Sequence, residues 1–161
     1  MFIFLALSLA YCGQRMARLK KRFEFLDHTA DLYIAAYGKT LEEAFENAAY
    51  ATFEGMTNLD KVQPRLEETV EVEGYDEKAL LYNWLEALLV KFDITSNLYS
   101  CFKIAGIERT PSGFKLKAKI WGEPFNPQKH ISKVGIKAVT YHQMEIVKEP
   151  ELATVKFILD I

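Results

Sequence analysis

The sequence is poor in several residue types, and each shortage excludes a class of protein. Its only two cysteines, Cys12 and Cys101, form neither a metal-binding spacing nor a disulfide framework, so a reduced, cytosolic protein is the simplest interpretation. The formal net charge is only -2, which argues against indiscriminate binding to nucleic acid or anionic membranes but is compatible with a local basic patch. The sequence contains no internal repeat, low-complexity tract or Walker-type phosphate loop.

The composition that is present indicates one domain. Half of the 161 residues are apolar, which is enough for a substantial core. The apolar run at residues 1–10 is too short to cross a bilayer and lacks the charged region that precedes the hydrophobic part of a signal peptide. Met16 offers a second start, so we expect residues 1–15 to be a dispensable extension or a mis-called start and residues 16–161 to form the domain. A genuine export signal is the alternative.

Two stretches have the pattern of amphipathic helices. Thr40 and Glu43 have capping-box spacing in front of apolar residues at helical intervals, which predicts a helix over residues 40–55. Asp76 can cap a second helix that runs from Glu77 to about Phe92. One wide apolar stripe on this second helix predicts that it packs in the core: Leu81, Trp84, Leu85, Leu88, Leu89 and Phe92.

The rest of the chain alternates between apolar and polar residues, which predicts about eight short strands. These strands cover residues 23–25, 32–37, 69–73, 101–107, 113–121, 135–141, 144–148 and 153–160. With the two helices they predict a compact α+β domain of mainly antiparallel strands. The polar stretch 123–133 contains prolines and is predicted to be a long surface loop in which His130 is exposed.

Three lysines, Lys115, Lys117 and Lys119, lie on one face of a predicted strand and are called the lysine row below. A solvated face that discourages edge-to-edge pairing of strands is one interpretation. A contact surface for RNA or for an acidic partner is the other.

The stretch between the first two predicted strands is a candidate site. It holds Asp27, His28 and Asp31 within five residues, and these side chains can act as metal ligands or as general acids and bases. The alternative is that Asp27 and Thr29 only make the hydrogen bonds of a turn.

A second candidate lies at the C-terminus, where the strand pattern continues almost to the last residue. An ordered strand there would fix Asp160 beside the terminal carboxylate of Ile161. Such an oxygen-rich corner suits Mg²⁺ or Ca²⁺. A frayed chain end without function is the alternative.

Three stretches together resemble the archease family: FEFLDHTADLYIAAYGKTLEEAFENAA, KAVTYHQMEI and the terminal VKFILDI. The resemblance extends from about Arg22 to Ile161. It implies an α+β fold with an inserted segment. It also implies a protein cofactor, rather than an enzyme, that assists the tRNA-splicing RNA ligase. In that role the protein would promote guanylylation of the ligase and so support multiple turnovers in joining 2′,3′-cyclic phosphate or 3′-phosphate ends to 5′-hydroxyl ends of RNA.

The resemblance also implies a site. A divalent cation, Ca²⁺ or Mg²⁺/Mn²⁺, would be held by Asp31, Asp160 and Ile161, and Lys137 matches the functional lysine of the family. Asp27, His28 and His142 could support these groups without binding the cation. The partners implied are the ligase and, indirectly, RNA, with no membrane and a cytoplasmic location.

Two other functions stay open at this stage. One is a stand-alone metal-dependent phosphohydrolase or nucleotide-binding enzyme that uses the same carboxylates, although the sequence shows no recognisable arrangement of a nucleophile and its base. The other is an RNA chaperone that uses the lysine row, which would bind RNA with a steep salt dependence and without the ligase.

Overall fold

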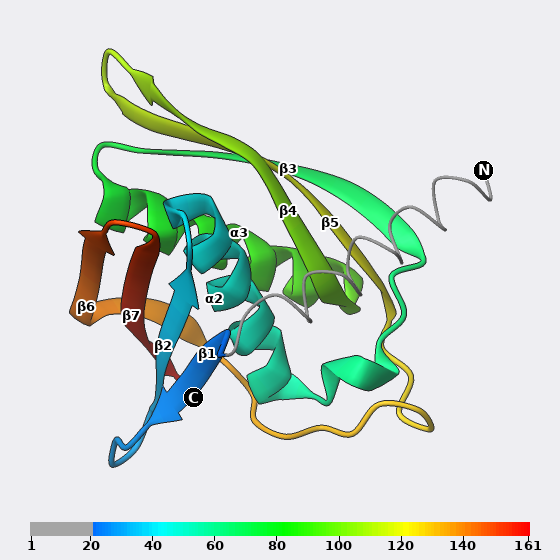
Figure 1. The fold of residues 1–161 in the computed structure, drawn as a ribbon. Coiled ribbons are helices and arrows are strands. Elements are labelled where there is room, and N and C mark those ends of the chain that lie inside the picture. The colour runs from blue at the N-terminus through cyan, green and yellow to red at the C-terminus, as the bar shows by residue number, and fades with distance from the viewer. Residues whose placement is uncertain (1–20) are drawn as a thin grey trace.

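The computed structural model describes residues 21–161, which form two antiparallel sheets with two helices packed between them (Figure 1). The predicted extension, residues 1–15, lies outside the described residues. One sheet has the strand order β1-β2-β7-β6 and the other has the order β3-β5-β4. The strands are β1 (Phe23–Leu26), β2 (Leu32–Gly38), β3 (Leu66–Gly74), β4 (Asn97–Thr110), β5 (Gly113–Pro124), β6 (Ala138–Glu149) and β7 (Leu152–Asp160).

The two ends of the described chain build one sheet and its middle builds the other. β1, β2, β6 and β7 form the four-stranded sheet, whereas β3, β4 and β5 form the three-stranded sheet. Both helices contact strands of both sheets. This is the α+β architecture that the sequence pattern predicted, with the inserted segment that the family resemblance implied. No helix within residues 21–161 is long and apolar enough to cross a membrane.

Both helices begin at the predicted caps. Helix α2 (Leu41–Met56) starts after Thr40, whose Oγ1 accepts a hydrogen bond from Glu43 N–H at 3.2 Å. Helix α3 (Glu77–Thr95) starts after Asp76, whose Oδ1 accepts a hydrogen bond from the N–H of Ala79 at 2.7 Å. The predicted end of α3 near Phe92 was too early. The helix continues to the left-handed Ser96 (φ 60°), and no glycine or proline marks that end in the sequence.

The core lies where the helices meet the sheets. The predicted stripe on α3 is buried except for Phe92, which is half-buried. Trp84 is fully buried, and its Nε1–H donates to Phe45 O of α2 at 3.0 Å, so its one polar atom is satisfied. Phe53 of α2 packs edge-on against Tyr99 and stacks with Phe102 of β4, which joins the helix layer to the three-stranded sheet.

The described chain has seven strands rather than eight because two predicted strands are one. The predicted strand at 144–148 and the predicted strand at 135–141 from residue 138 onward both belong to β6, which is interrupted by a bulge. Its pairing with β7 shifts register between Thr140 and Glu145, and Gln143 has a positive φ of 55°. The break in alternation therefore marked a bulge and not a turn.

Cysteine pairing also differs from the prediction. Cys101 is buried in β4 and is disulfide-bonded, so the interpretation of two reduced cysteines is wrong at this position. Cys12 lies outside the described residues. The spacing of two cysteines in a sequence does not show whether a sulfur atom has a partner in the folded chain.

The lysine row is solvated and paired with glutamates. β3 lies antiparallel to β5 and places Glu67 and Glu71 on the same face as the lysines. The Nζ atoms of Lys115, Lys117 and Lys119 lie 3.9, 3.7 and 3.9 Å from these carboxylates. The row is thus a face of alternating charge, which weakens its claim to be an RNA-binding surface.

Candidate functional site

Three strand ends meet at one corner of the four-stranded sheet, called the C-terminal corner below (Figure 1). β2 starts directly after Asp31, β7 ends at Asp160, and β6 starts directly after Lys137. Leu32 pairs with Leu159, so Asp31 lies one step beyond this pair, on the side of Asp160. The backbone N–H of Lys137 donates to Asp160 O at 2.7 Å, which continues the β6–β7 pairing by one bond.

This register brings together groups from three distant parts of the sequence. The loop between β1 and β2 supplies Asp31, the residue before β6 is Lys137, and the end of β7 supplies Asp160 and Ile161. The last strand is paired on both sides, with β2 and with β6, up to its final residues. An end held in this way is ordered, so the frayed-end alternative does not describe it.

His28 lies beside Asp31 in the loop between β1 and β2. Its Nδ1 lies 4.0 Å from Asp31 Oδ2, which is too long for a hydrogen bond. That Nδ1 is buried and has no hydrogen-bond partner among residues 21–161. The ring packs edge-on against Tyr33 of β2 with centroids 6.0 Å apart, so the imidazole is held beside the carboxylate.

Negative charge at this corner is not neutralised by the neighbouring side chains. Within the described chain, Asp160 forms no ion pair, and Asp31 has only the long contact with His28. Lys137 is exposed and forms no ion pair with another described residue. Its backbone position beside Asp160 is fixed while its ammonium group is open to solvent.

The other predicted site residues, Asp27 and His142, lie farther from the C-terminal corner. Asp27 is exposed directly after β1 and makes no polar contact with another described residue. His142 is exposed in the β6 bulge, several residues along the strand from the corner, and the structure does not bring it into contact with Asp31 or Asp160. Residues 21–161 contain no group of three or more His, Cys, Asp or Glu side chains that could hold a metal ion. The ligand set implied by the sequence has two such side chains, and its third member is the main-chain carboxylate of Ile161.

The loop that leads to Lys137 is anchored by a buried hydrogen bond between His130 and Glu123 that the sequence pattern did not predict. His130 was predicted to be exposed, but it is buried, and its Nε2 lies 2.9 Å from Glu123 Oε1. His130 Nδ1 accepts a hydrogen bond from Asn126 N–H at 2.9 Å, so the proton is on Nε2 and is donated to the carboxylate. Glu123 Oε1 also accepts from Lys129 Nζ at 2.6 Å and from Gln63 N–H at 3.1 Å. The loop folds inward because Glu123 can collect these donors.

This anchor changes the titration of Glu123. Burial alone would raise the pKa of the carboxyl group. The hydrogen bonds from Lys129, from Gln63 N–H and from His130 outweigh burial and hold the pKa below its ordinary value. Glu123 is therefore charged at neutral pH and keeps its donors in place.

The second half of the loop is tied to the end of α2. The N–H groups of Lys133 and Val134 donate to Met56 O at 2.9 Å and to Gly55 O at 3.3 Å, and so satisfy carbonyls that a helix end leaves free. Gly55 lies against Leu32, because a Cβ atom on it would be 2.7 Å from Leu32 Cδ2, so a larger residue there requires the leucine side chain to move. The helix end, the start of β2 and the loop before Lys137 are thus packed as one unit.

The groups at the C-terminal corner are of the types that contact cations and phosphates. Two aspartates and a terminal carboxylate are hard oxygen donors of the kind that Ca²⁺ and Mg²⁺ prefer. An exposed lysine beside them can contact a phosphate oxygen. No nucleophile hydrogen-bonded to a base is found at this corner among the described residues.

Comparison with known proteins identifies the family. Residues 23–161 match the model of the Archease protein family (MTH1598/TM1083). Protein archease of Sulfurisphaera tokodaii is 45% identical over 141 residues, covering 88% of this chain and 99% of the relative. Protein archease of Pyrococcus abyssi is 49% identical over 131 residues, covering 81% and 92%. The solution structure of Methanobacterium thermoautotrophicum protein 1598 matches with a TM-score of 0.77 and 42% identity, covering 87% of this chain and 99% of that one. The chain belongs to the archease family.

Proposed function

We propose that this protein is an accessory protein that activates the tRNA-splicing RNA ligase by promoting its guanylylation and its multiple turnover. The observation that carries the proposal is the C-terminal corner, where the strand register gathers Asp31, Asp160 and the chain end beside Lys137. Membership of the archease family supports the partner. An exposed corner with carboxylates and a lysine can contact the nucleotide-binding site of another protein.

The cation of the proposal would be held by Asp31, Asp160 and the terminal carboxylate of Ile161. These groups fit a hard divalent ion because all are oxygen donors and because, within the described residues, no lysine or arginine side chain is paired with the two aspartates. When bound, such an ion supplies positive charge that stabilises phosphate groups. His28 would orient Asp31 from its half-buried position beside it.

Lys137 would contact phosphate directly. Its backbone is fixed by the hydrogen bond to Asp160 O, so the root of the side chain does not move relative to the carboxylates. The lysine ammonium group is a compact charge on a flexible stem and can follow a phosphate group that changes position. The anchored loop before it, held by Glu123 and His130, sets where that stem begins.

The proposal is tested by the turnover of the ligase. RNA in large excess over ligase, with GTP and Mg²⁺ or Mn²⁺, should be joined for many cycles only when this protein is present. Asp160→Ala and Lys137→Ala should each abolish activation. Lys119→Ala is the matched control, because Lys119 is an exposed strand lysine paired with Glu67 at the far sheet. Equal activation by the three variants would refute the assignment of the corner.

Cation binding needs a test that does not depend on the ligase. At a Ca²⁺ concentration about 100 times Kd, binding should add about 2.7 kcal/mol to the free energy of unfolding. Ca²⁺ should therefore raise the Tm of the parent protein relative to EDTA, and should not raise that of Asp31→Ala or Asp160→Ala. Circular dichroism of both variants should match the parent. The protein alone should turn over neither GTP nor RNA, and turnover would favour the enzyme alternative.

A further inference from the structure

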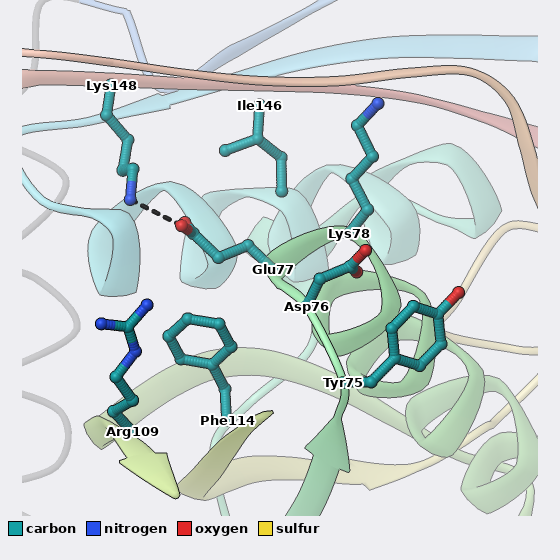
Figure 2. A pocket seen from close by; sticks show the side chains of 8 residues that line it. All are labelled: Tyr75, Asp76, Glu77, Lys78, Arg109, Phe114, Ile146 and Lys148. Carbon is teal, nitrogen blue, oxygen red and sulfur yellow. Dashed lines mark hydrogen bonds and ion pairs between the residues drawn. The ribbon is translucent and has the colours of Figure 1, made fainter. Parts of the chain in front are cut away.

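A polar pocket lies where the start of α3, the β4–β5 hairpin and the end of β6 meet, far from the C-terminal corner (Figure 2). Its volume is about 570 Å³. Lys148, near the end of β6, lines it, whereas Lys137 precedes the start of the same strand. The pocket is therefore separated from the proposed cation site by most of the length of β6. We call it the hairpin pocket.

The base of the hairpin pocket is fixed by two glycines. A Cβ atom on Gly74 would lie 2.4 Å from the backbone N of Leu80, so the end of β3 rests directly on the first turn of α3. A Cβ atom on Gly113 would lie 2.2 Å from Gly74 O, and Gly113 has a φ of 149°. These close backbone contacts hold the hairpin and the helix at a set distance.

Three basic and two acidic side chains line the hairpin pocket, so the charge of its lining is net positive. Lys78, Arg109 and Lys148 line it, and of these only Lys148 has an ion pair with a described residue, with Glu77 Oε1 at 2.6 Å. Arg109 lies over the ring of Phe114 with 5.7 Å between its Cζ and the ring centroid, and Figure 2 shows its guanidinium group on the same side of the pocket as Lys148. In the lysine row, in contrast, each lysine lies beside a glutamate, and Lys115 and Lys117 share Glu71.

Glu77 carries an unused acceptor in the middle of this positive charge. Its Oε1 accepts from Lys148, but its Oε2 is buried and has no hydrogen-bond partner among residues 21–161. A buried carboxylate oxygen without a donor is costly. A ligand that suits the site therefore brings a hydroxyl or amino donor for Glu77 as well as negative charge for Arg109.

An aromatic surface adjoins the polar groups. Tyr75 lines the pocket and is 75% exposed. Tyr141, which is 49% exposed, stacks on Tyr82 with parallel rings and centroids 4.4 Å apart. Exposed rings of this kind are platforms for planar bases. Asp76 already caps the first turn of α3 through Ala79 N–H, so the helix end by itself does not make the site.

We propose that the hairpin pocket binds a ribonucleotide, either free or as part of single-stranded RNA. The phosphate contacts Arg109 and the neighbouring Lys148. The ribose 2′-hydroxyl donates to the Glu77 carboxylate, which has to turn its buried Oε2 toward the ligand, and the base stacks on Tyr75. The 2′-hydroxyl is what distinguishes RNA from DNA, so Glu77 gives the pocket its preference for RNA. This site does not depend on the proposed action on the ligase.

The test is fluorescence anisotropy of the full chain with labelled oligouridylate and with the deoxy oligomer of the same sequence. RNA should bind several-fold more tightly than DNA. Arg109→Ala should weaken RNA binding about tenfold, as expected for one charge-assisted contact. The same variant should reduce the slope of log K against log salt by about 0.7. Competition by uridine monophosphate identifies a free nucleotide as ligand, and competition by unlabelled RNA alone identifies a strand.

Glu77→Ala separates recognition of the sugar from general attraction to anions. This variant releases Lys148, so total affinity for nucleic acid need not fall, but RNA and DNA should then bind alike. Lys119→Ala is the control and should change neither affinity nor preference. All variants should retain the circular dichroism spectrum of the parent, since the substituted side chains lie at the surface. Equal binding of RNA and DNA by the parent, unchanged binding by Arg109→Ala, or equally effective competition by an acidic peptide would overturn the proposal.

Discussion

Removal of the Glu123 carboxylate should loosen the loop before Lys137 and destabilise the whole domain. The side chain is only 7% exposed and collects three hydrogen bonds, from His130 Nε2 at 2.9 Å, Lys129 Nζ at 2.6 Å and Gln63 N–H at 3.1 Å. In Glu123→Ala, the fully buried His130 keeps only the carbonyl of Lys61 at 3.2 Å as acceptor, and Gln63 N–H loses its partner.

The size of the effect follows from these contacts. A hydrogen bond to a charged group contributes about 1.5–3 kcal/mol, and of the three donors the His130 ring is fully buried and the Gln63 N–H is partly buried. The contact with Lys129 is discounted, because its side chain is 34% exposed and solvent screens it. We therefore expect Glu123→Ala to lower the free energy of unfolding by about 3 kcal/mol. Glu123→Gln keeps an acceptor oxygen and should cost only about 1 kcal/mol.

The pH dependence gives an independent check. The folded-state pKa of Glu123 is depressed, so its carboxylate stabilises the fold above the ordinary carboxyl pKa of 4.5, and this stabilisation is lost as the pH falls through the folded-state value. The difference in stability between the parent and Glu123→Ala should thus be full at neutral pH and shrink in acid. Urea unfolding at several pH values measures it. A loss below about 1 kcal/mol at neutral pH, or a difference that does not change with pH, would refute the anchor.

Three further predictions test other parts of the structure. Gly74→Ala should destabilise the protein by at least about 2 kcal/mol in urea unfolding, because its Cβ would meet rigid backbone at 2.4 Å, and a smaller effect would contradict this packing. Burial, and then hydrogen bonds to Glu24 and Glu68, raise the pKa values of Tyr37 and Tyr99 to about 12. Ultraviolet titration should therefore show at least two tyrosines that ionise late, and one fewer in either the Tyr37→Phe or the Tyr99→Phe variant. A Gly-Ser-Gly extension after Ile161 should weaken Ca²⁺ binding and ligase activation, whereas an N-terminal tag should not; equal behaviour of the two would exclude the chain end as a ligand.

Sequence alone was sufficient where the determining interactions are local. The caps at Thr40 and Asp76 act within one helical turn, and both helices begin where these residues predict. Alternation likewise located the strands, and the α+β class was predicted from these strands and the two helices, whereas the inserted segment was implied by the family resemblance. The family resemblance also implied that Asp31, Asp160 and Lys137 are site residues, although the local sequence pattern does not show that they lie at one corner.

Tertiary structure decided the features that join distant residues. The corner exists because β7, the last strand, pairs between β2 and β6, and no local pattern encodes that order. His130 is buried because Glu123 and the main chain at Lys61 provide partners, a contact that spans 69 residues to Lys61. The hairpin pocket takes Glu77, Arg109 and Lys148 from three elements, and each residue taken singly has the pattern of an ordinary surface charge. Charged side chains form a binding site only where the folded chain brings them together without neutralising them. Which charges pair depends on the distances between them, and the sequence does not give these distances.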